Sequence, residues 1–307
     1  MEIDSYEQMS NADNMMDNAP DDFYLNQSFV PYIPSGFSYI AEEEKPVNIT
    51  SKAAVKCITR EMQMQIVNRL RIEGPDEVRR ICDYTQRTPE WFTAREHRIT
   101  GSRAGTAARM NPYESPDKLL CELMWPNFKG NAATRNGTKC EPFAAKSLLR
   151  IVRLADPGAH LAIPGLIVSQ KESFLAYSAD GVLLFSDGTK KLVEIKTPVK
   201  RKPYTSLPPM YKCQIQLGMH ILNLDACVFV TYCGTGRAGR DDETHIQEFN
   251  RDEEFISNIL LPRLRNFFFG RYLPLRVCFE RGMLRHNQCH VPNGVDVEKI
   301  DAACLKQ

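Results

Sequence analysis

Two β-prone runs on either side of Asp187-Gly188 constrain the fold of this chain more than any other feature. One run covers residues 174–185, where apolar side chains dominate, and the other covers residues 191–197, where apolar and polar side chains are mixed. An Asp-Gly pair between two such runs is typical of a tight hairpin turn. The sequence therefore predicts two neighbouring antiparallel strands.

The elements predicted around this hairpin are mostly helical in the first half of the chain. Apolar spacing and capping residues predict helices at 52–72, 76–84, 89–97, 102–110, 115–123 and 137–154. The second half is predicted to contain strands at 165–170, 226–233 and 245–249 and helices at 208–222 and 255–269. This order predicts an α/β (α+β) fold, in which a small central mixed β-sheet is flanked by helices, with a helical N-terminal part.

Charge is distributed unevenly along the chain. Residues 1–45 contain ten acids and one base, whereas the remainder contains 38 bases and 28 acids. An acidic segment without apolar periodicity is typical of disorder, so residues 1–50 are predicted to form a disordered tail. We expect a folded domain at 51–275 and a C-terminal extension at 276–307. The basic body favours an anionic polymer as partner, and an uneven but solvated surface is the alternative.

No run of about 18 apolar residues is present, so the sequence predicts no membrane span. No basic segment followed by an apolar stretch opens the chain, so no secretory signal is expected. The ten cysteines are scattered without a CxxC pair, which is typical of reduced thiols in a cell. We expect an intracellular protein; the sequence does not distinguish nucleus from cytoplasm.

The most informative residues lie in the predicted hairpin. Glu194 and Lys196 are two apart in a strand, so their side chains project from the same face. Asp180 lies 14 residues before Glu194, and hairpin pairing can bring the two carboxylates together. Carboxylates gathered in this way favour a hard cation such as Mg²⁺. With a lysine beside them, they suit phosphodiester hydrolysis, in which a metal activates water and offsets charge. An isolated Glu-x-Lys pair is more often a surface ion pair.

Four segments in order carry a resemblance to a known family: 91–102, 137–142, 178–181 with 193–197, and 211–216. The chain resembles the YqaJ family of viral recombinases, which is similar to phage lambda exonuclease within the PD-(D/E)xK superfamily. The resemblance covers residues 88–233, close to half of the chain. The sequence departs from the pattern at Ala179, where the superfamily name has proline, and at Gly101, where the family often has alanine.

The resemblance implies a role for each matching position. Asp180 and Glu194 would bind the metal directly, helped by the main-chain carbonyl of Ile195. Glu141 would complete the acidic cluster, directly or through water, although a first-turn helix acid is the alternative. The implied metal is Mg²⁺, for which Mn²⁺ can substitute.

The same resemblance extends to the substrate. Lys196 would position the nucleophilic water, and Gln214 would hold the lysine or the substrate. Arg95 and Ser102 would bind the terminal 5′-phosphate of DNA. For Gln214 a solvated helix position is the alternative, and for Arg95 an ordinary ion pair.

Further basic residues are candidates for contacts with the DNA backbone. They are Arg98, Arg103, Lys200, Arg201 and Lys202. The last three directly follow the strand that carries Lys196, which suits phosphates near the cut. A solvated loop is the alternative for them.

The implied function is a metal-dependent DNA exonuclease that acts 5′→3′ on linear duplex ends in recombination, repair or viral and mobile-element DNA processing. The resemblance also implies a single-strand annealing protein as partner and a homo-oligomer, although no residue pattern indicates either. Two alternatives stay open. One is a PD-(D/E)xK endonuclease that cuts DNA or RNA internally, and the other is an inactive nucleic-acid-binding scaffold.

Overall fold

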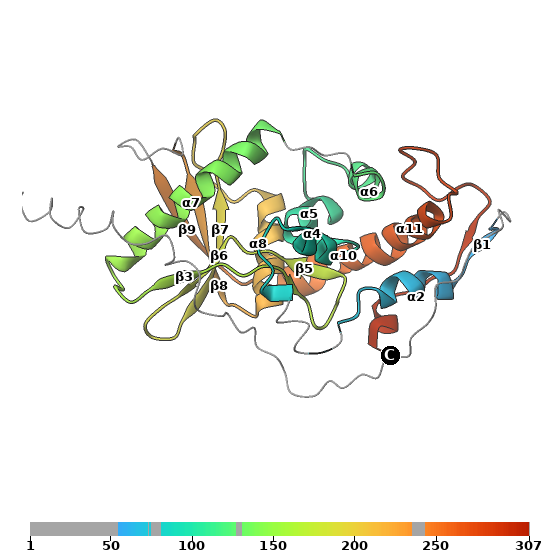
Figure 1. The fold of residues 1–307 in the computed structure, drawn as a ribbon, viewed down its shortest axis with the longest axis horizontal. Helices are drawn as coiled ribbons and strands as arrows, with labels where there is room; N and C mark the ends of the chain where they lie inside the picture. Colours follow the sequence, from blue (N-terminus) through green and yellow to red (C-terminus); the bar gives the residue numbers. More distant parts are fainter. Residues whose placement is uncertain (1–54, 73, 75–80, 127–130, 235–242, 307) are drawn as a thin grey trace, which may run out of the picture.

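The computed structural model describes residues 55–72, 74, 81–126, 131–234 and 243–306 (Figure 1). The predicted tail at 1–50 lies outside the described residues, and so does most of the predicted helix at 76–84. None of the helices in the described ranges is both long and apolar enough to cross a lipid bilayer.

A five-stranded mixed sheet is the largest in the described residues and lies on the left in Figure 1. Its strands, in spatial order, are β3 (His160–Ala162), β6 (Gly181–Leu184), β7 (Lys190–Lys196), β8 (Ala226–Tyr232) and β9 (Thr244–Asn250). Strands β7 and β8 are parallel, and every other neighbouring pair is antiparallel. The predicted fold class, a small mixed sheet flanked by helices, is confirmed.

The predicted hairpin joins β6 to β7. Gly188 has a φ of 87°, which glycine adopts without strain, and the Asp187 side chain accepts a hydrogen bond from the main-chain nitrogen of Thr189. Gly181 pairs with Val193 in the resulting register. Asp180 therefore enters the hairpin beside the strand that carries Glu194.

Two helices cover the two faces of the sheet. On one face α7 (Ala132–Arg153) packs its buried residues Cys140, Ala144 and Leu148 against alternate residues of β7 and β8, including Val193 and Ile195. On the other face α8 (Pro209–Leu222) packs Ile215 and Met219 with Leu192, Cys227 and Phe229. Because side chains alternate along β7, Glu194 and Lys196 face α8.

The predicted strand at 174–185 is wrong as a single element. It is two strands, β5 (Leu175–Tyr177) and β6, which belong to different sheets. Strand β5 pairs with β2 (Ile99–Thr100) and β4 (Ile167–Val168) in a second, three-stranded sheet. The chain leaves one sheet and enters the other at 178–180, where the side chains of Ser178 and Asp180 accept hydrogen bonds from distant residues.

Helices in the first half are largely where capping residues predict them. Thr88 caps α4 (Pro89–Arg95), and Ser115 caps α6 (Pro116–Met124); between them lies α5 (Gly101–Ala107). The helix predicted at 52–72 is shorter, because α2 (Arg60–Asn68) begins after Thr59, whose side chain accepts from the main chain of Met62. Helix α7 begins five residues earlier than predicted, because Asn131 caps it.

The closing helix is longer than the predicted 255–269. It runs without a break from α9 (Glu253–Phe255) through α10 (Leu261–Phe267) to α11 (Leu273–Glu280), with π-helical turns at Ile256–Leu260 and Phe268–Tyr272. Pro262 and Pro274 each lie two residues after the end of a π turn. The changed hydrogen-bond spacing accommodates their missing N–H groups, so neither proline ends the helix.

The C-terminal segment packs back onto the start of the described chain. Strand β10 (Asp296–Val297) pairs in parallel with β1 (Cys57–Ile58), and a short 3₁₀ helix follows at Ala302–Lys306. Helix α11 crosses the expected boundary at residue 275, and the division into domains stays a prediction.

Candidate active site

Asp180 and Glu194 come together at the entry of the β6–β7 hairpin. Oδ2 of Asp180 accepts a hydrogen bond of 2.7 Å from the main-chain nitrogen of Ile195, which fixes the carboxylate against β7. Burial raises the pKa of Asp180 well above its ordinary value, and the neighbouring Glu194 carboxylate raises it further. A half-buried acid next to a buried one is a costly arrangement unless a cation shares the two.

Three donors hold Glu194, which is 1% exposed. Its Oε1 accepts from Nζ of Lys196 at 2.5 Å and from Nε2 of Gln214 at 2.6 Å. Its Oε2 accepts from the hydroxyl of Tyr177 at 2.5 Å. The predicted site residues Glu194, Lys196 and Gln214 thus form one hydrogen-bonded group.

Lys196 is half-buried, and its ammonium lies between the Glu194 carboxylate, the Gln214 amide and the Tyr211 ring. Its Nζ also donates to Oε1 of Gln214 at 3.2 Å and lies 4.7 Å from the centre of the Tyr211 ring. Burial lowers the pKa of Lys196, but the carboxylates of Glu194 and Asp180 raise it by more, so the pKa lies above its ordinary value. The lysine is therefore positively charged at neutral pH.

Glu141 projects from α7 toward the same cluster, and its charge contributes to the raised pKa of Asp180. Its carboxylate does not join the other two. Instead, Oε2 of Glu141 accepts a hydrogen bond of 2.6 Å from Nη2 of Arg87, a residue that sequence reasoning missed. In the described part of the chain, no three acid, histidine or cysteine side chains are grouped so that they could hold a metal as they stand.

The oxygen ligands that remain without Glu141 nevertheless fit a magnesium-like ion. Mg²⁺ is commonly held by only one or two carboxylates, with water and substrate phosphate completing its coordination. Asp180 and Glu194 supply two carboxylates, and the main chain at Ile195 supplies a carbonyl oxygen. The Glu194 carboxylate raises the pKa of the neighbouring Asp180, so a cation bound between the two would offset their repulsion.

Arg87 adopts an unfavourable backbone conformation, with a φ of 73°. A left-handed conformation costs a residue other than glycine about 1–2 kcal/mol. The side chains of Arg87 and Glu141 are 50% and 34% exposed, and an ion pair this exposed contributes at most about 1 kcal/mol. The ion pair therefore does not offset the strain.

Arg95 lies beside the acidic cluster. Hydroxyl groups and an aromatic ring, rather than a carboxylate, hold its guanidinium in place. Its guanidinium stacks 4.1 Å from the centre of the Trp91 ring and donates to the hydroxyls of Ser178 (3.0 Å) and Thr100 (3.2 Å). Burial, and then the nearby charge of Arg103, lowers the pKa of Arg95 to about 10. Among the described residues no carboxylate pairs with Arg95 or Arg103. This position can accept an anion.

Sequence reasoning missed the roles of Tyr177 and Ser178. Tyr177 is fully buried and donates to Glu194, and Ser178 accepts from both Trp91 and Arg95. The signal was their proximity to Asp180, since both lie within three residues before it. Ser102, predicted beside Arg95, is exposed in the first turn of α5.

The structure does not support one predicted backbone contact. Arg98 is 7% exposed, and its guanidinium donates to the main-chain oxygens of Ser173, Ala94 and Leu70. It therefore joins segments of the protein rather than facing DNA.

The other predicted contacts lie nearer the surface. Lys200, Arg201 and Lys202 are exposed after β7, and Arg103 is half-buried. Their proposed contacts with DNA stay predictions.

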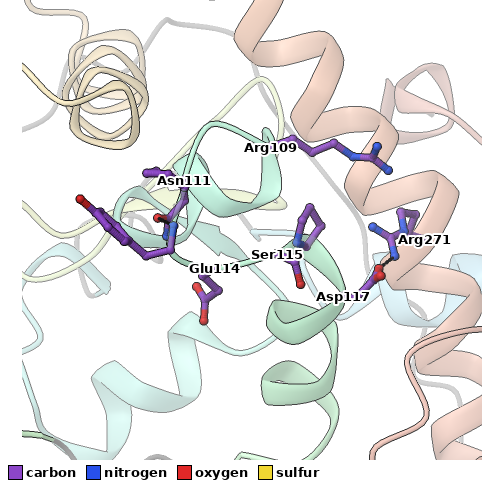
Figure 2. Close-up of a pocket in the computed structure, with 9 residues that line it drawn as sticks. Arg109, Asn111, Glu114, Ser115, Asp117 and Arg271 are labelled. Atoms are coloured by element: carbon purple, nitrogen blue, oxygen red, sulfur yellow. Dashed lines mark hydrogen bonds and ion pairs between the residues drawn. The ribbon is translucent and has the colours of Figure 1, made fainter.

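A separate cavity of about 450 Å³ lies between the loop after α5, the start of α6 and the second π turn (Figure 2). It is lined by Arg109, Asn111, Pro112, Tyr113, Glu114, Ser115, Pro116, Asp117 and Arg271. Figure 2 shows Arg271 turned toward Asp117, with which it forms an ion pair. No residue of the acidic cluster lines this cavity.

The sheet order and the site together define the class of the fold. An aspartate that enters a central hairpin, a Glu-x-Lys pair on the next strand and flanking helices form a restriction-endonuclease-like core. Residues 90–237 match the family of the YqaJ-like viral recombinase domain. These residues make up just under half of the chain's length.

An uncharacterized protein of Acanthamoeba polyphaga mimivirus is 25% identical over 210 residues, which are 62% of this chain and 35% of the relative. The chain thus spans about a third of that relative's length.

Among solved structures, the alkaline exonuclease LHK-Exo of Laribacter hongkongensis is 27% identical, covers 64% of this chain and 97% of its own, and has a TM-score of 0.48. Its complex with dAMP is 26% identical over the same shares, with a TM-score of 0.49.

Proposed function

We propose that this chain is a divalent-metal-dependent DNA exonuclease that degrades one strand of linear duplex DNA from its 5′ end. The observation that carries the proposal is the close pair of half-buried Asp180 and buried Glu194, with Lys196 bonded to Glu194, inside a YqaJ-like domain. Its proposed setting is recombination, repair or the processing of viral and mobile-element DNA.

Asp180, Glu194 and the main-chain carbonyl of Ile195 would hold Mg²⁺, or Mn²⁺ in its place, with Glu141 as a further ligand. The bound ion would supply an acidified water and offset the charge of the pentavalent phosphorus. The protein's own part is to place these oxygens. The hydrogen bond from Ile195 fixes Asp180, and the hydroxyl of Tyr177 fixes Glu194.

Lys196 would orient the attacking water and add positive charge next to the phosphate. Its ammonium is held between Glu194 and Gln214, so its position does not depend on the substrate. Gln214 bonds both Glu194 and Lys196, and we propose that it aligns the pair. A positively charged lysine favours the orienting role over that of a base.

End specificity would come from Arg95. Its guanidinium is rigidly placed by Trp91 and Ser178, and Ser178 lies two residues before Asp180. A terminal 5′-phosphate bound at Arg95, with Ser102 nearby, would therefore lie close to the metal-binding carboxylates. Such a site would bind DNA ends in preference to internal positions.

The 3′-tailed product suits a single-strand annealing protein as partner, and a ring of identical subunits would explain processive action. Both are proposals. Light scattering of the purified chain, alone and with duplex DNA, tests the second.

In the deciding experiment the protein is incubated with three substrates: linear duplex DNA with 5′-phosphate ends, linear duplex DNA with 5′-hydroxyl ends, and closed circular DNA. Each is incubated with Mg²⁺ or with EDTA. The variant Lys196→Ala is compared with Lys191→Ala, which removes a half-buried lysine of the same strand that pairs with Glu248. We expect loss of linear 5′-phosphorylated DNA only, abolished by EDTA and by Lys196→Ala but not by Lys191→Ala. Cutting of the circle would indicate an endonuclease, and binding without any cleavage would indicate an inactive scaffold.

A further inference from the structure

Arg87 lies at the edge of the acidic cluster, in the turn before α4. The turn is tied down by its neighbour Gln86, whose Nε2 donates to the main-chain oxygens of Ala179 at 2.8 Å and Pro164 at 2.9 Å. Ala179 directly precedes Asp180. The guanidinium of Arg87 is therefore carried on a rigid support next to the segment that holds a metal-binding carboxylate.

Stability does not explain why an arginine occupies this position. Its left-handed backbone favours glycine, and the half-exposed ion pair with Glu141 is too weak to offset that preference. A strained residue at the rim of a reaction site indicates that its side chain has a function there.

The ion pair also determines where Glu141 points. The carboxylate is bonded to Arg87, and the three acids do not form a ready metal site in the described part of the chain. When a divalent cation is bound at Asp180 and Glu194, the Glu141 carboxylate is attracted toward it and the guanidinium is repelled. Both effects favour separation of the pair.

We propose that Arg87 is a phosphate-binding residue that the free protein keeps paired with Glu141 and that metal binding releases to DNA. The inference rests on the proposed nuclease function. A guanidinium presents a planar fork of donors that fits a phosphate with two hydrogen bonds, and a carboxylate is the group with which it competes. Arg87 then couples metal binding to DNA binding, because the residue is available only after Glu141 has turned to the metal.

The first test titrates Mn²⁺ alone into the full chain by calorimetry. Arg87→Gly, which suits the backbone, is compared with Arg109→Gly, which removes an exposed arginine of similar φ (59°) from the cavity of Figure 2. We expect Arg87→Gly to bind Mn²⁺ about five- to tenfold more tightly, because Glu141 loses its competing partner, and Arg109→Gly to match the wild type. Unchanged or weaker Mn²⁺ binding by Arg87→Gly would overturn the proposal.

The double variant Glu141→Gln/Arg87→Gly separates this competition from a general effect of charge. Glu141→Gln alone removes the partner for which Arg87 and the metal compete. We therefore expect Arg87→Gly to give a much smaller gain in Mn²⁺ affinity in that background, where only the direct repulsion between guanidinium and cation is removed. A gain of the same size with and without Glu141 would contradict a specific exchange.

The second test measures binding of 5′-phosphorylated duplex DNA by fluorescence anisotropy, with Ca²⁺ to limit cleavage or with EDTA. We expect Arg87→Gly to weaken DNA binding about tenfold in Ca²⁺ and less than about threefold in EDTA. In Ca²⁺, the affinity of Arg87→Lys should lie between those of Arg87→Gly and the wild type. Equal losses in both conditions, or none, would refute the coupling. If the wild type cuts linear DNA while these results fail, only the role of Arg87 is lost; if the wild type neither binds nor cuts DNA, the nuclease function itself fails.

Discussion

The ring of Tyr177 lies between two glycines, and this arrangement makes Gly101→Ala a demanding test of the site. A Cβ added at Gly101 would lie 2.4 Å from Cε2 of Tyr177, and one added at Gly218 would lie 2.6 Å from its Cζ. The ring cannot move away easily, because α8 lies behind it and its hydroxyl is bonded to Glu194. The added methyl group must therefore displace a side chain that positions Glu194, the carboxylate proposed to bind the metal.

The expected loss follows from overpacking a buried site. Inserting a methyl group into a packed core destabilises by about 1–3 kcal/mol. At about 2–4 °C per kcal/mol for domains of 150–250 residues, the melting temperature should fall by about 2–12 °C. We also expect slower DNA cleavage, because the hydroxyl of Tyr177 is pushed off Glu194.

Thermal and urea denaturation of Gly101→Ala measure the effect, with Gly137→Ala as the matched control. A Cβ at Gly137 would lie 3.7 Å from Oγ1 of Thr197, an ordinary contact, inside the long helix α7. Gly137→Ala should therefore gain about 0.5–1 kcal/mol. The double variant Gly101→Ala/Tyr177→Leu should lose less stability than the sum of the losses of the two single variants. A stable Gly101→Ala variant, or strictly additive losses, would refute this account of the ring.

Three further predictions concern the same region. Tyr177→Phe removes one of the three donors to Glu194, so we expect a loss of about 1–3 kcal/mol of stability in urea denaturation and slower cleavage; unchanged values for both would contradict the positioning role. Arg95→Ala should slow digestion of 5′-phosphorylated ends about tenfold or more, down to the rate on 5′-hydroxyl ends, in a gel-based assay; a persistent preference for the phosphate would disprove its role. Burial lowers the pKa of His97 to about 4, from 6.5, so its neutral form favours the folded state. The contribution of His97 to stability is complete above pH 6.5 and is lost as the pH falls through about 4. The variant His97→Asn, which tolerates the φ of 59°, should show a smaller loss between these pH values in urea titrations, and an identical loss would exclude His97 as the cause.

Local patterns were sufficient to predict the centre of the site. Asp187-Gly188 set the register that brings Asp180 next to the strand of Glu194, and the two-residue period of that strand placed Glu194 and Lys196 on one face. The caps Thr88 and Ser115 predicted where α4 and α6 begin, because a cap uses only atoms within three residues.

What the sequence did not predict depends on distant contacts. The run at 174–185 has uniform β propensity, and only the hydrogen bonds that Ser178 and Asp180 make with α4 and β7 reveal that it divides between two sheets. Arg87 meets Glu141 across 54 residues, and no local pattern indicates that pair. The closing helix was predicted too short because Gly270 and Pro274 ordinarily end a helix, whereas packing and a π turn carry it through them.

The pairing of β1 with β10 has a kinetic consequence for synthesis of the chain. Cys57 pairs with Asp296, and Nε2 of Gln63 donates to the main-chain oxygen of Glu298, 235 residues later. At about 5–20 residues per second, a ribosome needs about 10–50 s to make that stretch. During this time Ile66 and Val67, which are buried in the finished protein, lack the C-terminal part of their packing surface. The nascent chain should therefore bind holdase chaperones through α2 until the segment with β10 has emerged.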